Sequence, residues 1–242
     1  MIRVLIGLAI LFFTSNVFAQ TAPPAPPAPQ GFVSLGGDIP DAEGSCEAPF
    51  TNDLVLEFEV RDLQLVNLTA SVNPFIIISG FEHTWVGDLT VKLIAPDNTE
   101  HIIFSRVGLT AASSLGDSSD LSPDPESSYL FEDATDLNFW TAARIVDDTT
   151  PIPGGEAVTY PTHAAGSSNI LGGQTAPITS MNMAFENVRN PNGTWKLCFA
   201  DEAGNDVGSV VQAQLFLNNL VPAEPLCLPI VTQNGTTVLI CL

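Results

Sequence analysis

The side chains best able to do chemistry in this 242-residue sequence are its carboxylates. Asp and Glu together number 27 against seven Lys and Arg, and the formal net charge at pH 7 is −20. Clustered carboxylates can bind hard cations, because calcium takes roughly six to eight oxygen ligands. The alternative is a solvated acidic surface that keeps the protein soluble. In both cases such a charge repels nucleic acid and anionic membranes, which excludes both as partners.

The cysteines form a second chemically informative set: Cys46, Cys198, Cys227 and Cys241. Their number is even, they show no C-x-x-C spacing, and the three histidines (His83, His101 and His163) do not cluster with them, so we assign the histidines no role. This pattern favours disulfides over zinc and an oxidising compartment such as a periplasm or the cell exterior. Three pairings are possible. We favour Cys46–Cys198 together with Cys227–Cys241.

The N-terminus predicts export. Arg3 precedes an apolar run over residues 4–13, a polar break follows at residues 14–16, and small or modest residues stand at Val17 and Ala19, the two positions that export peptidases read. This is typical of a signal peptide over residues 1–19. Ten apolar residues rise only about 15 Å as a helix, about half a bilayer core, so we expect no transmembrane segment. Residues 20–36 contain the stretch TAPPAPPAPQ and are interpreted as an extended Pro/Ala-rich linker.

The rest of the chain is punctuated by short strand-like runs rather than by helical periodicity. The clearest apolar or alternating runs span residues 54–61, 75–78, 88–94, 194–199 and 210–217. Turns rich in Gly, Pro, Asn and Asp separate them, which is typical of a sandwich or jelly roll. We therefore predict an all-β protein, a jelly-roll-like antiparallel β-sandwich over residues 37–219. Residues 108–174 show weaker patterning and are expected to form long loops at one end of the sandwich, where binding residues are common.

The C-terminal residues 220–242 are predicted to form a β-hairpin around Asn234-Gly235, a strong two-residue turn signal. Strict register around such a turn would place Cys227 opposite Leu242. A bulge near Pro229 would absorb one residue and bring Cys227 opposite Cys241, so we predict this bulge and a Cys227–Cys241 disulfide.

Four segments in order carry a family resemblance. They are Asp38-Ile39-Pro40-Asp41, the run HTWVGDLTVKLIAPDNT from His83, Phe131-Glu132-Asp133, and the run NGTWKLCFADEAGNDVG from Asn192. Together these resemble the P domain (P/Homo B domain), the β-sandwich that follows the catalytic domain in proprotein convertases and many bacterial subtilisin-like proteases. The resemblance covers about residues 37–219. Ala213 stands where family members usually have Trp, and residues 108–174 match only loosely.

The resemblance implies a cation site, because secreted P domains often bind calcium. The candidate ligands in or beside the matched segments are Asp88, Glu132, Asp133, Asp201 and Asp206. A second acidic loop contains Asp117, Asp120, Asp124 and Glu126. Solvated carboxylates in turns are the alternative interpretation for both groups.

The resemblance to a protease-associated domain requires a test for catalysis. Thr179-Ser180-Met181 resembles the nucleophile motif of subtilisin-like proteases, but Ile178 stands where that motif has glycine. No helical pattern follows, and the sequence lacks the family's aspartate and histidine motifs. A serine without an orienting base is not activated, so we predict no catalytic residues.

These observations favour an exported, non-catalytic P-domain-like module, stabilised by calcium. It would act as an accessory or binding domain at the cell surface or outside the cell. Its partner would be a protease, a cell-surface protein or a glycan. The alternatives are a carbohydrate-binding, lectin-like module in which Trp85 and Trp140 stack on sugar rings, and a cryptic hydrolase. For tryptophan, a buried core position is the more frequent role.

Overall fold

The fold is taken from a computed structural model in which the backbone is described for most of the chain beyond residue 30. The described residues are 31–41, 44–65, 72–111, 115–122, 124, 126–133, 137–146, 150–155, 158–167, 169–170, 174–217, 220–222, 227–231 and 237–241. The predicted signal peptide (1–19) and the Pro/Ala-rich part of the linker lie outside them.

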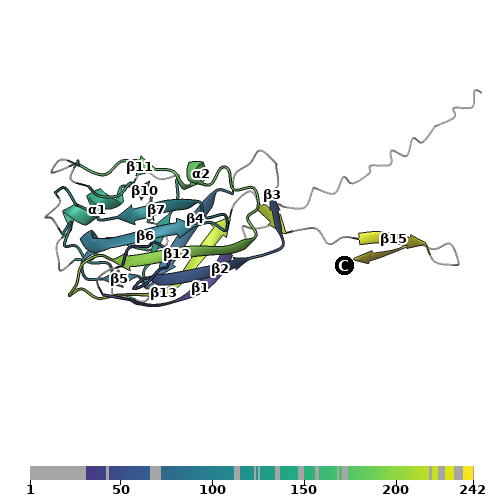
Figure 1. The fold of residues 1–242 in the computed structure, drawn as a ribbon, viewed down its shortest axis with the longest axis horizontal. Coiled ribbons are helices and arrows are strands. Elements are labelled where there is room, and N and C mark those ends of the chain that lie inside the picture. The colour runs from purple at the N-terminus through teal and green to yellow at the C-terminus, as the bar shows by residue number, and fades with distance from the viewer. Residues whose placement is uncertain are drawn as a thin grey trace, which may run out of the picture.

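Two β-sheets make up the body of the protein (Figure 1). The first has the order β1-β13-β4-β8-β9, with β5 also paired to β13. Its strands are β1 (Gly31–Ile39), β13 (Gly208–Leu217), β4 (Pro74–Ser79), β8 (Ser128–Phe131), β9 (Thr159–Tyr160) and β5 (Glu82–His83). The second has the order β2-β12-β6-β7, formed by β2 (Leu54–Val60), β12 (Gly193–Asp201), β6 (Leu89–Ile94) and β7 (Glu100–Ser105). Every pairing in these sheets is antiparallel except β8 with β9. The predicted all-β antiparallel sandwich is confirmed.

The strands form where apolar residues alternate or run continuously. In β4 buried and half-buried residues alternate, because one face of a strand meets the core and the other does not. In β6 every residue is buried, because the loop of residues 44–53 covers the outer face of this sheet. All five strand-like runs singled out in the sequence are strands.

Aromatic side chains fill the core between the sheets. Trp195 is fully buried, and its indole N–H donates to the carbonyl of Pro191 at 2.9 Å. Phe104 lies against Phe131 and Phe139, with ring centroids 5.7 and 4.7 Å apart. Trp140 is also fully buried, so the hypothesis that it stacks on sugar rings is wrong; Trp85 is half-buried.

The smaller elements are a 3-10 turn, two short helices and three two-stranded sheets. The turn and helices are η1 (Val86–Asp88), α1 (Phe139–Ile145) and α2 (Met181–Ala184). The small sheets are β3 (Leu63–Leu65) with β14 (Leu220–Pro222), β10 (Thr162–His163) with β11 (Ile178–Thr179), and β15 (Cys227–Val231) with β16 (Thr237–Cys241). Among the described residues no helix has the length and apolar character needed to cross a membrane.

Two predicted boundaries and the interpretation of one segment need correction. β1 begins at Gly31, so residues 31–36 belong to the sandwich and not to the linker. β14 pairs with β3, so the unit continues past residue 219. The segment 108–174 contains β8, α1, β9 and β10 and supplies core residues, so its interpretation as long loops alone is wrong.

The cysteine predictions have different outcomes. Cys46 and Cys198 form a disulfide whose sulfur atoms are both buried, as predicted. In the C-terminal hairpin the backbone register pairs Cys227 with Cys241. The register is regular through Pro229, which faces Leu239, so the predicted bulge is wrong. The strands pair up to Val231 and Thr237, and residues 232–236, between them, lie outside the described part of the chain.

Candidate metal centre

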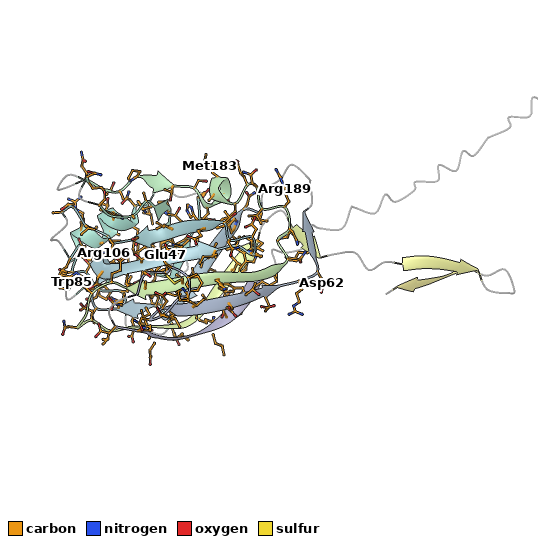
Figure 2. All side chains as sticks on the ribbon, viewed as in Figure 1. Glu47, Asp62, Trp85, Arg106, Met183 and Arg189 are labelled. Atoms are coloured by element: carbon orange, nitrogen blue, oxygen red, sulfur yellow. A yellow bond between two sulfur atoms is a disulfide. The ribbon has the colours of Figure 1, made fainter. Side chains whose placement is uncertain are left out.

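Two of the predicted cation ligands meet a histidine at one end of the sandwich. Asp88 is the last residue of η1, Asp201 is the last residue of β12, and His83 ends β5. One ligand atom from each lies within 4.8 Å of the other two, and all three side chains are buried. β12 and β6 hold them in place, since Asp201 pairs with Leu89 directly after Asp88. Trp85 is half-buried and comes directly before η1. It lies at this end of the sandwich, and Asp62 lies at the opposite end (Figure 2).

Gly87 allows the backbone around Asp88 to pack tightly. Its N–H donates to the carbonyl of Asp117 at 2.9 Å. A Cβ at this position would lie 2.3 Å from the amide nitrogen of Asp117, closer than atoms can approach. Glycine is needed here because the segment at residues 115–117 approaches the backbone closely. This packing buries Asp88.

Asp88 is electrostatically unsatisfied in the described protein. Its side chain is 1% exposed, and its Oδ1 atom has no hydrogen-bond partner there. Burial, followed by the negative charges of Asp201 and Asp206, raises the pKa of Asp88 to about 8. A buried carboxylate oxygen with no hydrogen-bond partner is costly unless the group is protonated or binds a cation, although its own backbone amide and the charge of Arg106 partly offset the burial of Asp88. With a pKa of about 8, Asp88 is protonated near neutral pH when no cation is bound, and a bound cation is the other way to satisfy this carboxyl group.

His83 orients Asp201. The backbone N–H of Trp85 donates to Nδ1 of His83 at 3.1 Å, so in the neutral ring the proton is on Nε2. Nε2 lies 3.3 Å from Oδ2 of Asp201 and donates to it. Burial lowers the pKa of His83, and Asp201 opposes this effect. With both ring nitrogens engaged, His83 offers a metal no lone pair, and the remaining ligands are oxygens. An all-oxygen set favours a hard cation over zinc or copper.

Further carboxylates surround the pair. Asp206 is half-buried and accepts a hydrogen bond from the hydroxyl of Thr84 at 3.1 Å. Asp41 is exposed and accepts a hydrogen bond from the amide of Asn205 at 3.0 Å. Burial raises the pKa of Asp201, and the negative charge of Asp41 raises it further. These residues lie near enough to Asp88 and Asp201 to contribute negative charge to the site.

Glu132 and Asp133 do not join this group. The amide of Glu132 donates to the carbonyl of Tyr160. Asp133 accepts hydrogen bonds from the hydroxyl of Ser180, from the amide of Met181 at 2.9 Å and from the amide of Asn182 at 3.2 Å. Asp133 therefore holds the start of α2, and its carboxylate oxygens are engaged there.

Ser180 is the N-cap of α2, because its hydroxyl accepts the amide of Met183 at 3.0 Å. The expectation that no helix follows Ser180 is wrong, because Met181–Ala184 form the short helix α2. His101 is hydrogen-bonded to two threonines: its Nε2 lies 2.8 Å from the hydroxyl of Thr162 and 3.4 Å from the hydroxyl of Thr179. The hydrogen bonds made by Ser180 are those of a helix cap.

The second acidic loop is organised as turns. Oδ1 of Asp117 accepts the amide of Ser119 at 3.1 Å, and Oδ1 of Asp124 accepts the amide of Glu126 at 3.0 Å. Among the described residues one other group has ligand atoms close together: Cys46, Asp53 and Cys198. Its two sulfur atoms are bonded to each other, so it is not a metal site.

His83 lies at the candidate site although its sequence context assigns it no role. The residue begins one of the two longest segments that carry the family resemblance, five positions before Asp88, so a signal was present. Its partner Asp201 lies 118 residues away, however, and no local pattern reveals that contact. Comparisons with protein-family models, curated proteins and solved structures found no match.

Proposed function

We propose that this chain is an exported, non-catalytic, P-domain-like module that binds calcium at Asp88 and Asp201. It would act as an accessory or binding domain at the cell surface or outside the cell. The observation that carries the calcium site is the buried Oδ1 atom of Asp88, which has no partner and lies beside a second buried carboxylate. Calcium would supply the missing positive charge.

Calcium fits the ligand chemistry of this end of the sandwich. The free lone pairs belong to carboxylates, and His83 is engaged through both ring nitrogens. Asp206 and Asp41 add negative charge nearby. Water and backbone carbonyls complete the coordination of calcium in many protein sites.

Two observations support the rest of the proposal. The Cys46–Cys198 disulfide is compatible with an oxidising compartment. The hydroxyl of Ser180 donates to Asp133 and accepts the amide of Met183, a helix-capping role that supports a non-catalytic assignment.

The test is thermal unfolding of the mature protein in millimolar calcium and in chelator. A ligand that binds only the folded state at a hundredfold excess over Kd adds about 2.7 kcal/mol of stability. We expect calcium to raise the melting temperature of the wild type and to have no effect on Asp88→Asn. Asn preserves the shape of the side chain and needs no counter-ion, so this variant should fold in chelator.

Asp62→Asn is the matched control. Asp62 lies at the opposite end of the sandwich (Figure 2), and its φ of 58° is one that Asn tolerates well. It should keep the full calcium response. Equal melting of the wild type in calcium and in chelator would refute the calcium site.

A further inference from the structure

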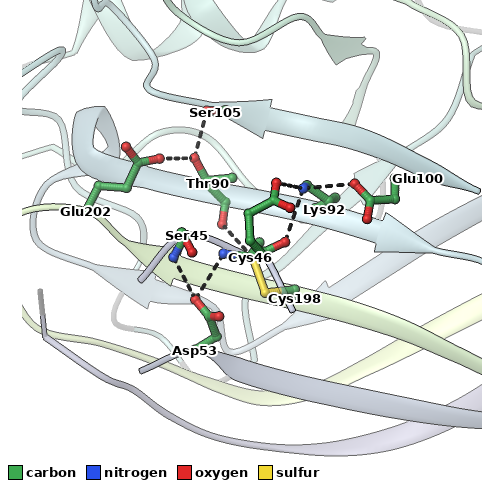
Figure 3. A network of polar contacts seen from close by, with 10 residues as sticks. Ser45, Cys46, Asp53, Thr90, Lys92, Glu100, Ser105, Cys198 and Glu202 are labelled. Carbon is green, nitrogen blue, oxygen red and sulfur yellow. Dashed lines mark hydrogen bonds and ion pairs between the residues drawn. A yellow bond between two sulfur atoms is a disulfide. The ribbon is translucent and has the colours of Figure 1, made fainter. Parts of the chain in front are cut away.

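The outer face of the second sheet is closed by the loop of residues 44–53, the covering loop (Figure 3). Cys46 in this loop is bonded to Cys198 of β12. Nζ of Lys92 on β6 donates to the carbonyl of Cys46 at 3.1 Å and to Glu47 at 2.8 Å. A disulfide and charged hydrogen bonds therefore hold a polar cover over this sheet.

The outer face of the first sheet carries an apolar surface that reaches solvent. The intervening residues of β13 and β4 are buried, so three adjacent cross-strand rows of β1, β13, β4 and β8 face outward. Apart from Gly, Ser and Gln, these rows contain the six residues of the outer patch: Val33, Leu35, Phe75, Ile77, Leu130 and Phe216. Val33 and Leu35 are 58% and 79% exposed, and the rings of Phe75 and Phe216 stack with centroids 4.4 Å apart. The three rows contain no charged residue, in a protein whose net charge is −20.

The C-terminal hairpin of β15 and β16 presents a second uncharged surface. No residue after Glu224 is charged. The register pairs Leu228 with Ile240 and Ile230 with Val238. These four apolar residues share one face of the hairpin, because residues alternate between the two faces of a strand. A two-stranded hairpin is at best marginally stable in water unless it packs against another surface.

The chain keeps the two surfaces within reach of each other. Phe216 is the last residue but one of β13, and β14 follows from Leu220. Residues 223–226 join β14 to β15, a connection that spans at most about 18 Å. Each hairpin strand has five residues and is about 17 Å long, and the three rows of the patch extend over about 13 Å. The hairpin is therefore long enough to cover the patch.

From these surfaces we infer that the C-terminal hairpin packs on the outer patch of its own chain, through the face that contains Leu228 and Ile240. It forms a third layer on the sandwich, closer to the first sheet than Figure 1 draws it. Both surfaces are apolar, so their association removes apolar area from water. A second copy of the chain would bring a further charge of −20 to the patch, whereas the hairpin brings none. The short connection also gives the hairpin an effective concentration of millimolar order.

Hydrogen–deuterium exchange of the full mature chain tests this contact, with the amides of residues 227–241 as the readout. Val33→Lys places a charge in the patch at a position that is 58% exposed, so the sandwich should still fold. We expect the hairpin amides to exchange at least tenfold faster in this variant than in the wild type. Ile178→Lys is the matched control, because Ile178 lies on β11, outside the first sheet, and is 57% exposed. Its hairpin amides should exchange as those of the wild type do.

The concentration dependence of the exchange distinguishes the hairpin's own chain from a second copy. Protection that is lost in Val33→Lys, kept in Ile178→Lys and independent of protein concentration supports the inference. Equal exchange in Val33→Lys and the wild type would overturn it. Protection that increases with concentration, together with a dimer in light scattering, would also overturn it, because the hairpin would then pack on a second copy. Leu35→Lys, at the most exposed position of the patch, replaces Val33→Lys if the melting curve of that variant shows a loss of fold.

Discussion

Nε2 of His83 lies 3.3 Å from Oδ2 of Asp201, and both side chains are at most 1% exposed. The Trp85 amide fixes the tautomer by donating to Nδ1, so His83 can only donate to Asp201. His83 is therefore a positioning residue for the proposed metal ligand. This role differs from that of a ligand in a way that can be measured.

His83→Gln should weaken calcium binding without abolishing it. Residues that orient metal ligands typically change affinity by about 10–100-fold when mutated. We expect a loss of that size in calorimetric titration with calcium, and a complete loss for Asp88→Asn. Zinc titration of the wild type is the control. If zinc bound more tightly than calcium and His83→Gln removed that preference, His83 would be a ligand and the assignment would be wrong.

Ser180→Ala should destabilise the protein. It should leave any casein hydrolysis seen with the wild type unchanged. Replacing an N-cap serine costs about 1 kcal/mol, and here the change also removes the donor to Asp133. Urea unfolding measures the loss. Casein hydrolysis is followed in parallel, with Ser167→Ala as the control serine. Hydrolysis that depends on Ser180 alone would contradict the non-catalytic proposal.

The parts of the fold that sequence could predict are those with a regular pattern. β2, β4, β6, β12 and β13 follow the alternation or continuous apolar character that a sandwich imposes on its strands. The segment over 128–145 lacked such a pattern, because β8 and α1 are short and their burial depends on tertiary packing. One local signal was available: the side chain of Asn138 accepts the amide of Thr141 and caps α1.

The candidate site was predicted only in part, for a related reason. Asp88 and Asp201 are brought together by the pairing of β6 with β12. Asp133 carries the same functional group, but its oxygens hold the start of α2. A carboxylate that accepts backbone amides and one that can bind a cation look alike in sequence. Only the three-dimensional surroundings distinguish them.

The stability contributed by His101 and His163 should fall as the pH falls from about 6.5 to about 4, whereas Asp88, whose pKa is raised to about 8, works in the opposite direction. Burial lowers the pKa of both His101 and His163 from 6.5 to about 4. In this window the unfolded chain binds protons that the folded protein does not, so their contribution is present above pH 6.5 and lost toward pH 4. Each histidine contributes a slope of at most about 1.4 kcal/mol per pH unit.

Urea unfolding at pH 5 and pH 7 checks this slope. A His101→Gln/His163→Gln double variant should show a shallower dependence on pH than the wild type, because neither replacement titrates. An identical slope in the two proteins would assign the acid sensitivity to other groups.

Removing the Cys46–Cys198 disulfide should cost about 2–5 kcal/mol, the usual range for a native disulfide in a small secreted domain. The bond joins positions 152 residues apart. A Cys46→Ala/Cys198→Ala variant avoids leaving a reactive thiol, and its unfolding in urea is compared with that of the wild type. The variant should retain the fold in the cold, since Lys92 still bonds to the covering loop. A change below about 1 kcal/mol would show that these contacts alone hold the loop.

Cys227 and Cys241 should be bonded in the mature protein. The backbone register of β15 and β16 places them directly opposite each other, and directly opposed residues in an antiparallel pair are about 4.5–5.5 Å apart at Cα. That spacing lies within the range of disulfides. Isolated hairpins are marginally stable in water, so a covalent link across the ends of the strands would stabilise this one. Peptide mapping without reduction should recover a fragment that joins residues 227 and 241. A fragment joining Cys46 to Cys227, or Cys198 to Cys241, would contradict both the register and the bond between Cys46 and Cys198.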